Sequence, residues 1–389
     1  MASEQLTEMA IMAVLFASPS RHYVRVMDTT MNTITLDRAA VTPRQLRAAI
    51  ADDKAMLKAA AELTRDLVKP RPAIYWADLI ASSLVGYAAL AAAVMAASMW
   101  AAVAAGAVAV FALYRGMSMI HELTHMKHAA LPGFRAGWNA LIGVPMMIPS
   151  FMYEGVHNLH HAKTRYGTSE DPEYLPLALM KPWTLPAFIL VSALAPVGLL
   201  IRFAVLAPLS ALSPKLRATV ISRYSALSIN PQFRRRLPQG DEKARWDRVE
   251  TATAVWAIAL IACTAAGVLP LKAFLIFLAV GSGVALINQV RTLVAHLWEN
   301  EGEVMTVTAQ YLDSVNVPPP ALLPALWAPI GLRYHALHHL LPGIPYHALG
   351  EAHRRLSDVL EPGSPYYKAN YRGLPGLVGK LASATMRLR

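Results

Sequence analysis

Long uncharged stretches alternate with shorter polar ones along most of the chain. No charged residue occurs in residues 79–113, a run too long for one membrane-spanning helix of about 20 residues and about right for two. We therefore predict a helical hairpin with its turn at residues 98–100. Two further uncharged runs, residues 251–271 and 273–290, are separated by Lys272 and predict a second hairpin.

A third uncharged stretch, residues 183–201, is long enough to span a membrane, but it contains Pro186 and Pro196, and proline disrupts helices. A single crossing there would put the basic residues that follow it on the opposite side of the membrane from Lys69 and Lys127. It would also separate the histidine clusters described below. We therefore expect an interfacial or re-entrant segment at this position, and four membrane-spanning helices in total.

The N-terminal region lacks a strong membrane signal. The apolar stretch at residues 10–17 follows Glu4 and Glu8 but no Lys or Arg, which argues against a cleaved signal peptide. Residues 42–69 mix Ala and Leu with charged residues at helical spacing, and Thr42 followed by proline is typical of a helix start. We predict an amphipathic helix that lies on the membrane or on the body of the protein.

Composition supports a membrane protein. Hydrophobic residues make up 55% of the chain and charged residues 16%, whereas soluble domains carry about 25% charged residues. The formal net charge is +11, but Lys and Arg fall mainly between the apolar runs, where the positive-inside bias places them. We therefore expect no nucleic-acid partner. The one cysteine, Cys263, excludes an intramolecular disulfide framework and a Cys-rich metal site, so any metal must be held by nitrogen and oxygen.

Ten of the thirteen histidines fall into three clusters and one isolated position. The sequence HELTHMKH holds His121, His125 and His128, whose spacing places them on one face of a helix. HNLHH and HALHH repeat another spacing, and contain His157, His160, His161, His335, His338 and His339. The isolated His296 follows the fourth predicted span.

These clusters point to metal binding. Imidazoles packed closely would repel one another if protonated, and a bound metal keeps them neutral. Imidazole suits iron, zinc and copper. Nine or ten nitrogen donors exceed what one metal can use, so we predict two metal ions. For any single histidine, a surface or core position without metal is an equal alternative.

The order HxxxH, HxxHH, isolated histidine, HxxHH, with a hairpin before the first box and before the isolated histidine, resembles the membrane fatty acid desaturases. Finer matches are DPE at residues 171–173, RTL at 291–293 ahead of His296, and LPGIPYH at 341–347. The resemblance covers roughly residues 74–355. It implies an all-α integral membrane fold, in which four helices in two hairpins carry a cytoplasmic helical cap with the histidine boxes.

On this basis we divide the chain into an N-terminal cytoplasmic or interfacial region (1–72), a desaturase-type membrane catalytic domain (73–356) and a C-terminal cytoplasmic tail (357–389). The resemblance implies nine catalytic ligands to two iron ions: His121, His125, His157, His160, His161, His296, His335, His338 and His339. Glu122 and Asp171 are predicted to orient ligating imidazoles. His128 departs from the family, whose first box usually needs two histidines, and it is predicted to orient a ligand, to bind metal or to be structural. His347 and His353 are predicted to be outer or surface residues.

The implied activity is the O2-dependent introduction of a double bond into a long acyl chain of a lipid or thioester. Side chains alone cannot remove hydrogen from an unactivated methylene, so a metal cofactor with O2 must do so. No HPGG, CxxCH or Rossmann glycine pattern occurs in the chain, so electrons must come from a separate ferredoxin, rubredoxin or cytochrome-type donor. We expect the enzyme in the inner cell membrane, with its active site facing the cytoplasm.

Two surfaces follow from this activity. The basic stretch at residues 234–248 is a candidate dock for an acidic electron donor, and a positive-inside loop explains the same charges equally well. The acyl chain is expected to enter an apolar tunnel beneath the metals. Its candidate lining residues are Met146, Met147, Phe151, Met152, Trp298 and Trp327.

Two alternatives remain. A hydroxylase of the same fold, such as an alkane monooxygenase, is favoured by the HEL start of the first box and by SEDPE at residues 169–173, whereas LPGIPYH favours a desaturase. A distant alternative is an intramembrane zinc protease, because HELTH satisfies HExxH with Glu122 as general base. A protease would use one metal and three ligands, which leaves both HxxHH clusters unexplained.

Overall fold

The computed structural model describes residues 50–386. Its regular elements are helical, and the described residues contain isolated β-bridges but no strand. The first described helix is α4 (Lys54–Leu63), whose N-terminus is capped by the Asp53 side chain accepting from the Met56 amide. His22, the apolar stretch at residues 10–17 and the predicted helix start at Thr42 lie outside the described residues.

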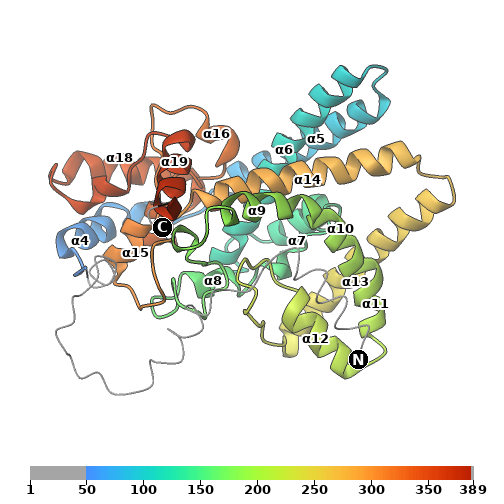
Figure 1. The fold of residues 1–389 in the computed structure, drawn as a ribbon, viewed down its shortest axis with the longest axis horizontal. Coiled ribbons are helices and arrows are strands. Elements are labelled where there is room, and N and C mark those ends of the chain that lie inside the picture. Colours follow the sequence, from blue (N-terminus) through green and yellow to red (C-terminus); the bar gives the residue numbers. More distant parts are fainter. Residues whose placement is uncertain (1–49, 387–389) are drawn as a thin grey trace.

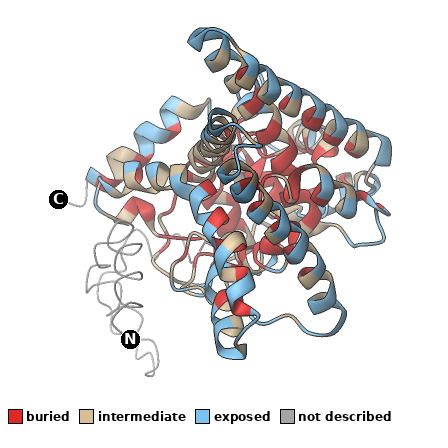
Figure 2. Cartoon of the chain, turned by 90° about the vertical axis from the view of Figure 1, so that its right-hand side faces the viewer, coloured by how far each residue is buried: buried red, intermediate tan, exposed pale blue. Residues whose placement is uncertain are grey.

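The first predicted hairpin is confirmed. It consists of α5 (Pro72–Met95) and α6 (Met99–His125), so the turn lies slightly earlier than predicted. Pro72 occupies the first turn of α5, where its missing N–H costs nothing. At the far end of this hairpin Met95 is 83% exposed and Trp100 78%, and Figure 2 shows that exposed residues cover the projecting ends of the helices while buried ones gather where helices meet. Such apolar exposure is typical of a surface in contact with lipid.

The second hairpin is confirmed as well. It consists of α13 (Gly240–Ala265) and α14 (Leu271–Leu293). The chain reverses through Gly267, whose positive φ of 72° suits glycine. The Lys272 ammonium donates to the Ala96 carbonyl in the turn of the first hairpin. The turns of both hairpins therefore lie at the same end of the molecule.

The apolar segment after residue 183 is a fifth helix long and apolar enough to cross a membrane, Thr184–Ser210. It runs along α14 and then turns toward α13 (Figure 1). The predicted count of four spans is therefore not confirmed. The segment changes its hydrogen-bonding pattern along its length, as expected where prolines remove backbone donors. Its parts are α9 (Thr184–Leu190), η5 (Val191–Leu194), α10 (Ala195–Leu200), η6 (Ile201–Leu206) and α11 (Ala207–Ser210).

A buried ion pair fixes the end of this fifth helix. Arg202 is 3% exposed and pairs with Glu250 of α13, which is 5% exposed. The same guanidinium donates to the Tyr224 carbonyl and the Ser225 hydroxyl. Two charges removed from solvent are tolerated because each finds several polar partners.

Short helices pack over the histidine-bearing ends of the long ones. They are η1 (Arg65–Leu67), α7 (Phe134–Trp138), η2 (Asn139–Gly143), η3 (Ser150–Met152), α8 (His157–His160), η4 (Leu177–Leu179), α12 (Pro214–Tyr224), α15 (Val307–Asp313), α16 (Pro324–Trp327), α17 (His335–Leu340), η7 (Tyr346–Ala348), α18 (Leu349–Val359), η8 (Pro365–Ala369) and α19 (Leu374–Met386). The C-terminal region packs on this layer, since Leu377 and Leu381 are buried in two of its apolar clusters. The predicted tail is thus part of the folded body.

Candidate metal centre

The first histidine box lies at the end of α6. His121 and His125 are one helical turn apart and face the same way. The helix ends at His125, where the Met126 amide donates to the Glu122 carbonyl. The expectation that His128 shares this helical face is wrong, because His128 lies beyond the helix end and is exposed.

The two HxxHH boxes form the short helices α8 and α17, and His296 follows α14 in a β-bridge with Ser314. The buried Asn316 places α17, because its side-chain oxygen accepts from the Leu337 amide. The third box therefore sits on a short helix that a tertiary hydrogen bond holds in place.

The structure brings nine histidines together in two groups. Within each group the candidate ligand atoms lie within 4.8 Å of one another. The five-histidine group contains His121, His125, His157, His161 and His338. The four-histidine group contains His160, His296, His335 and His339. In each HxxHH box, the first and third histidines belong to one group and the second histidine belongs to the other.

The spacing within these groups fits metal ions. The Nε2 atoms of His335 and His296 are 3.0 Å apart, and those of His338 and His161 are 3.1 Å apart. Ligands at right angles on metal–nitrogen bonds of about 2.1 Å lie about 3 Å from each other. Nε2 of the buried His121 has no hydrogen-bond partner, and the hydrogen-bond contacts of the other Nε2 atoms are with one another. Convergent nitrogens with so few partners of their own suit a pair of metal ions better than a hydrogen-bond network.

Carboxylates hold the second box from outside. Both oxygens of Asp171 accept from Nδ1 of His160, the closer at 2.9 Å, and the same carboxylate accepts from the amides of Gly167 and Glu173. Glu173 accepts from Nδ1 of His157 at 2.8 Å. Such bonds fix the ring orientation and leave Nε2 free to bind a metal.

A tyrosine supports the isolated histidine. The Tyr166 hydroxyl accepts from Nδ1 of His296 and donates to Asp313, at 2.8 Å in both cases. Tyr174 donates to the same carboxylate at 2.9 Å. No sequence pattern predicted a role for Tyr166, Tyr174 or Asp313. They share no motif or spacing with His296, and only the fold brings them together.

Burial keeps most of these imidazoles neutral. Burial, and next the charge of neighbouring histidines, lower the pKa values of His157, His161 and His338 well below the ordinary value. His160 differs: burial alone would lower its pKa, but the Asp171 carboxylate raises it above the ordinary value. Burial raises the pKa of Glu173 to about 7. Neutral imidazole is the form that binds metal.

Other predicted residues lie outside both groups. Glu122 approaches Nδ1 of His121 only to 3.8 Å, and its carboxylate instead accepts from the Tyr75 hydroxyl and the Tyr346 amide. It therefore joins α5 to the segment after the third box rather than orienting His121. His347 accepts from a backbone amide, and His353 bonds a tyrosine hydroxyl.

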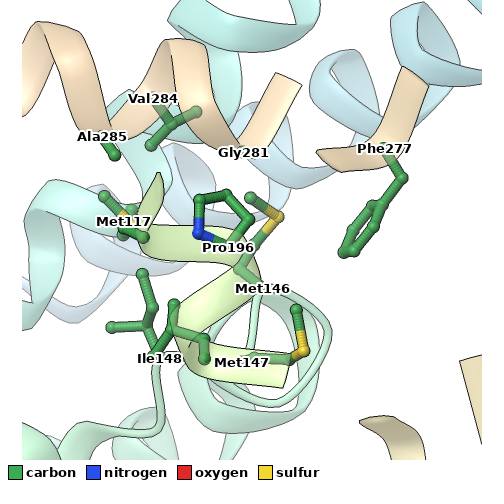
Figure 3. Close-up of a pocket in the computed structure, with 11 residues that line it drawn as sticks. Met117, Met146, Met147, Ile148, Pro196, Phe277, Gly281, Val284 and Ala285 are labelled. Carbon is green, nitrogen blue, oxygen red and sulfur yellow. The ribbon is translucent and has the colours of Figure 1, made fainter. Parts of the chain in front are cut away.

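A small apolar cavity lies among the long helices, and Figure 3 shows the residues that line it. Its volume is about 30 Å³, and α6, α10, α14 and residues 146–148 line it. Met117 in its wall precedes His121 by one helical turn, which is about 6 Å along the axis. Met146 and Met147 line this cavity, and Phe151 and Met152 pack in the apolar cluster that also contains Met147. Trp298 and Trp327 pack in two other clusters, and the acyl tunnel itself stays a prediction.

The basic stretch at residues 234–248 uses much of its charge internally. Arg235 is buried, donates to two backbone carbonyls and stacks on the Trp246 ring at 3.9 Å. Arg236 pairs with Glu242, and Lys243 with an aspartate one turn further on. This surface is thus less basic than its sequence indicates.

Comparison with known proteins agrees with this arrangement. Residues 97–371 match the family model described as fatty acid desaturase. The chain is 48% identical over 331 residues to a protein named ceramide hydroxylase from Caulobacter vibrioides (strain NA1000 / CB15N), with 85% of this chain and 94% of that protein covered. No solved structure matches the chain.

Proposed function

This chain belongs to the fatty acid desaturase family, and from that premise we propose that it is an O2-dependent hydroxylase of ceramide-type lipids with a histidine-held di-iron centre. The observation that carries this proposal is the 48% identity to a ceramide hydroxylase along 94% of that protein. Desaturation was the first expectation from the sequence. This relative favours the hydroxylase alternative.

The proposed reaction replaces one C–H bond of the lipid by C–OH. One atom of O2 enters the lipid and the other leaves as water, with two electrons from an outside donor and two protons. Two iron ions bound at the nine histidines would supply the oxidant that protein side chains cannot. The chain's own residues would hold the ligands in place, through Asp171 on His160, Glu173 on His157 and Tyr166 on His296. The apolar wall around Met117 would exclude water from the side where the lipid arrives.

The remaining expectations belong to the same proposal. The protein would lie in the inner cell membrane with the histidine-bearing layer in the cytoplasm, where Lys and Arg between the apolar runs favour it. A separate ferredoxin, rubredoxin or cytochrome-type protein would supply the electrons. Glu242 and Asp247 pair with basic residues of the stretch 234–248 and neutralise part of its charge. Docking of the electron donor at this stretch would therefore rely on few charges.

A zinc protease is not favoured by the site. Its general base would have to face a metal-bound water, but both hydrogen bonds of Glu122 hold it against Tyr75 and Tyr346. At least six of the nine grouped histidines would also have no role.

Purified protein loaded with iron, supplied with a reductant system, ceramide and isotopically labelled O2, tests the proposal by mass spectrometry. We expect ceramide to gain one labelled oxygen atom, and His338→Ala to abolish this gain. His128→Ala is the matched control, because His128 is exposed and outside both groups, and it should keep full activity. A product that has lost two hydrogens and gained no oxygen would show desaturation instead.

A further inference from the structure

Arg291 is an unpaired cation near the metal centre. It lies in the last turn of α14, within an apolar helix. Its Nε is buried without a hydrogen-bond partner, Nη2 donates to the Asn288 side chain over a long 3.4 Å, and the guanidinium lies within hydrogen-bonding reach of the Tyr114 hydroxyl. No carboxylate among residues 50–386 forms an ion pair with it.

The guanidinium lies where three elements meet. It is beside the Tyr114 hydroxyl of α6, which donates to the Trp327 carbonyl at 2.9 Å. The short helix α16 packs across both α6 and α14 at this point. The charge is also close to the four-histidine group, because Arg291 precedes His296 by only five residues.

This position is electrostatically unfavourable for an unpaired cation. Charged residues within apolar spans are costly, usually face the protein interior and mark substrate or ion pathways. Arg291 also adds positive charge beside imidazoles that would hold two metal cations. An arginine near a helix end often extends its head into water; here the side chain is half-buried and its Nε is fully buried. The free donors of Arg291 are therefore available to a polar ligand that arrives next to the metal centre.

The ligand would come from the bilayer. The segment that carries α16 exposes Leu322 by 84% and Leu323 by 70%, which extends the apolar surface of α6 and α14 toward the cytoplasmic layer. Arg291 is about 30 Å along the axis from the start of α14 at Leu271, so it would lie near the level of the lipid head groups. A carbon in the middle of an acyl chain brings no polar atom to this site, whereas a ceramide carries its amide close to the head group.

We propose that Arg291 binds the amide carbonyl oxygen of the ceramide-type substrate and so sets which carbon reaches the metal centre. The inference rests on the proposed function. It makes Arg291 a specificity-determining residue and defines the substrate class as lipids with an acceptor oxygen near the reacting carbon.

The test is equilibrium binding to the iron-loaded protein without O2, so that no turnover occurs. The probes are a fluorescent ceramide and a long-chain alcohol with the same label, which lacks the carbonyl. Since a hydrogen bond to a charged group contributes to binding, Arg291→Gln should weaken ceramide binding by roughly 10-fold to 100-fold and leave alcohol binding and iron content unchanged. Lys272→Gln, at the other end of the same helix, is the matched control and should bind both probes as the wild type does.

Wild-type ceramide affinity in Arg291→Gln would overturn the inference, as would an equal loss for both probes or a loss of iron. If Arg291→Gln does not fold, Arg291→Lys replaces it in the binding experiment, because lysine keeps the charge but lacks the planar guanidinium. Ceramide affinity of Arg291→Lys equal to that of the wild type would again overturn the inference. If the wild type neither binds nor hydroxylates ceramide, the proposed function itself is wrong. If the wild type hydroxylates ceramide and Arg291→Gln does so with the same KM, only this inference is wrong.

Discussion

Replacing Asp171 by Asn should selectively weaken metal binding at the four-histidine group. The Asp171 carboxylate accepts four hydrogen bonds, two of them with Nδ1 of His160 and two from the amides of Gly167 and Glu173. An asparagine has the same shape but has one acceptor oxygen, and its NH2 group would face a donor. Loss of such outer support typically lowers metal affinity by about 10-fold to 100-fold, or roughly 1.4 to 2.8 kcal/mol.

Iron per chain, measured after dialysis against increasing chelator, checks this reasoning. The variant should release about one iron at a chelator concentration that leaves the wild type loaded, because His160 belongs to the four-histidine group and the five-histidine group keeps its ligands. Glu170→Gln is the control: its side chain is 66% exposed and touches only Arg165 at 3.5 Å. Retention of both irons by Asp171→Asn, or equal loss of both, would refute the assignment of Asp171 to one group.

Three further predictions follow from the same geometry. Tyr166→Phe removes the link between His296 and Asp313 and should lower iron affinity by about 10-fold, seen in the same chelator titration; full retention would contradict this. Because most of the buried imidazoles have pKa values below the ordinary 6.5, the unfolded chain takes up more protons than the folded one below that pH. Stability and bound iron should therefore fall as the pH decreases below 6.5, measured as melting temperature and iron content; constant values between pH 6.5 and pH 5 would contradict this. Glu250→Ala leaves buried Arg202 without its carboxylate and should destabilise the protein by about 3–5 kcal/mol in denaturant unfolding, whereas Arg354→Ala on the surface should have little effect; equal midpoints for the two variants would refute the role of the buried pair.

The sequence predicted the parts of the site that depend on local spacing. The boxes HNLHH and HALHH each form one helical turn, and the uncharged runs set both hairpins. The spacing gave one wrong prediction. Placing His128 on the same face of α6 assumed that the helix continues to residue 128, but it ends at His125. The spacing of residues along the chain does not reveal where a helix ends or which other elements pack against that end.

The tyrosine and carboxylate partners could not be predicted, because they lie far from the histidines in sequence. Tyr166 is 130 residues from His296, and Asp313 reaches the site only because the backbone after α15 pairs with that around His296. The fifth apolar helix was also underestimated. Its prolines predicted a break in the helix. The segment instead stays helical and changes its backbone hydrogen-bond pattern from one part to the next.

The division of each HxxHH helix between the two groups of histidines has a consequence for how the centre assembles. One turn of α8, and one turn of α17, contributes donors to both ions, so ordering that turn around the first ion preforms part of the second pocket. In the wild type, binding of the first ion should therefore assist binding of the second, whereas Asp171→Asn, in which only the four-histidine group is weakened, should still accumulate the half-filled form. Inserting one residue within either box should direct its imidazole rings to the wrong groups of histidines and so disrupt both metal sites.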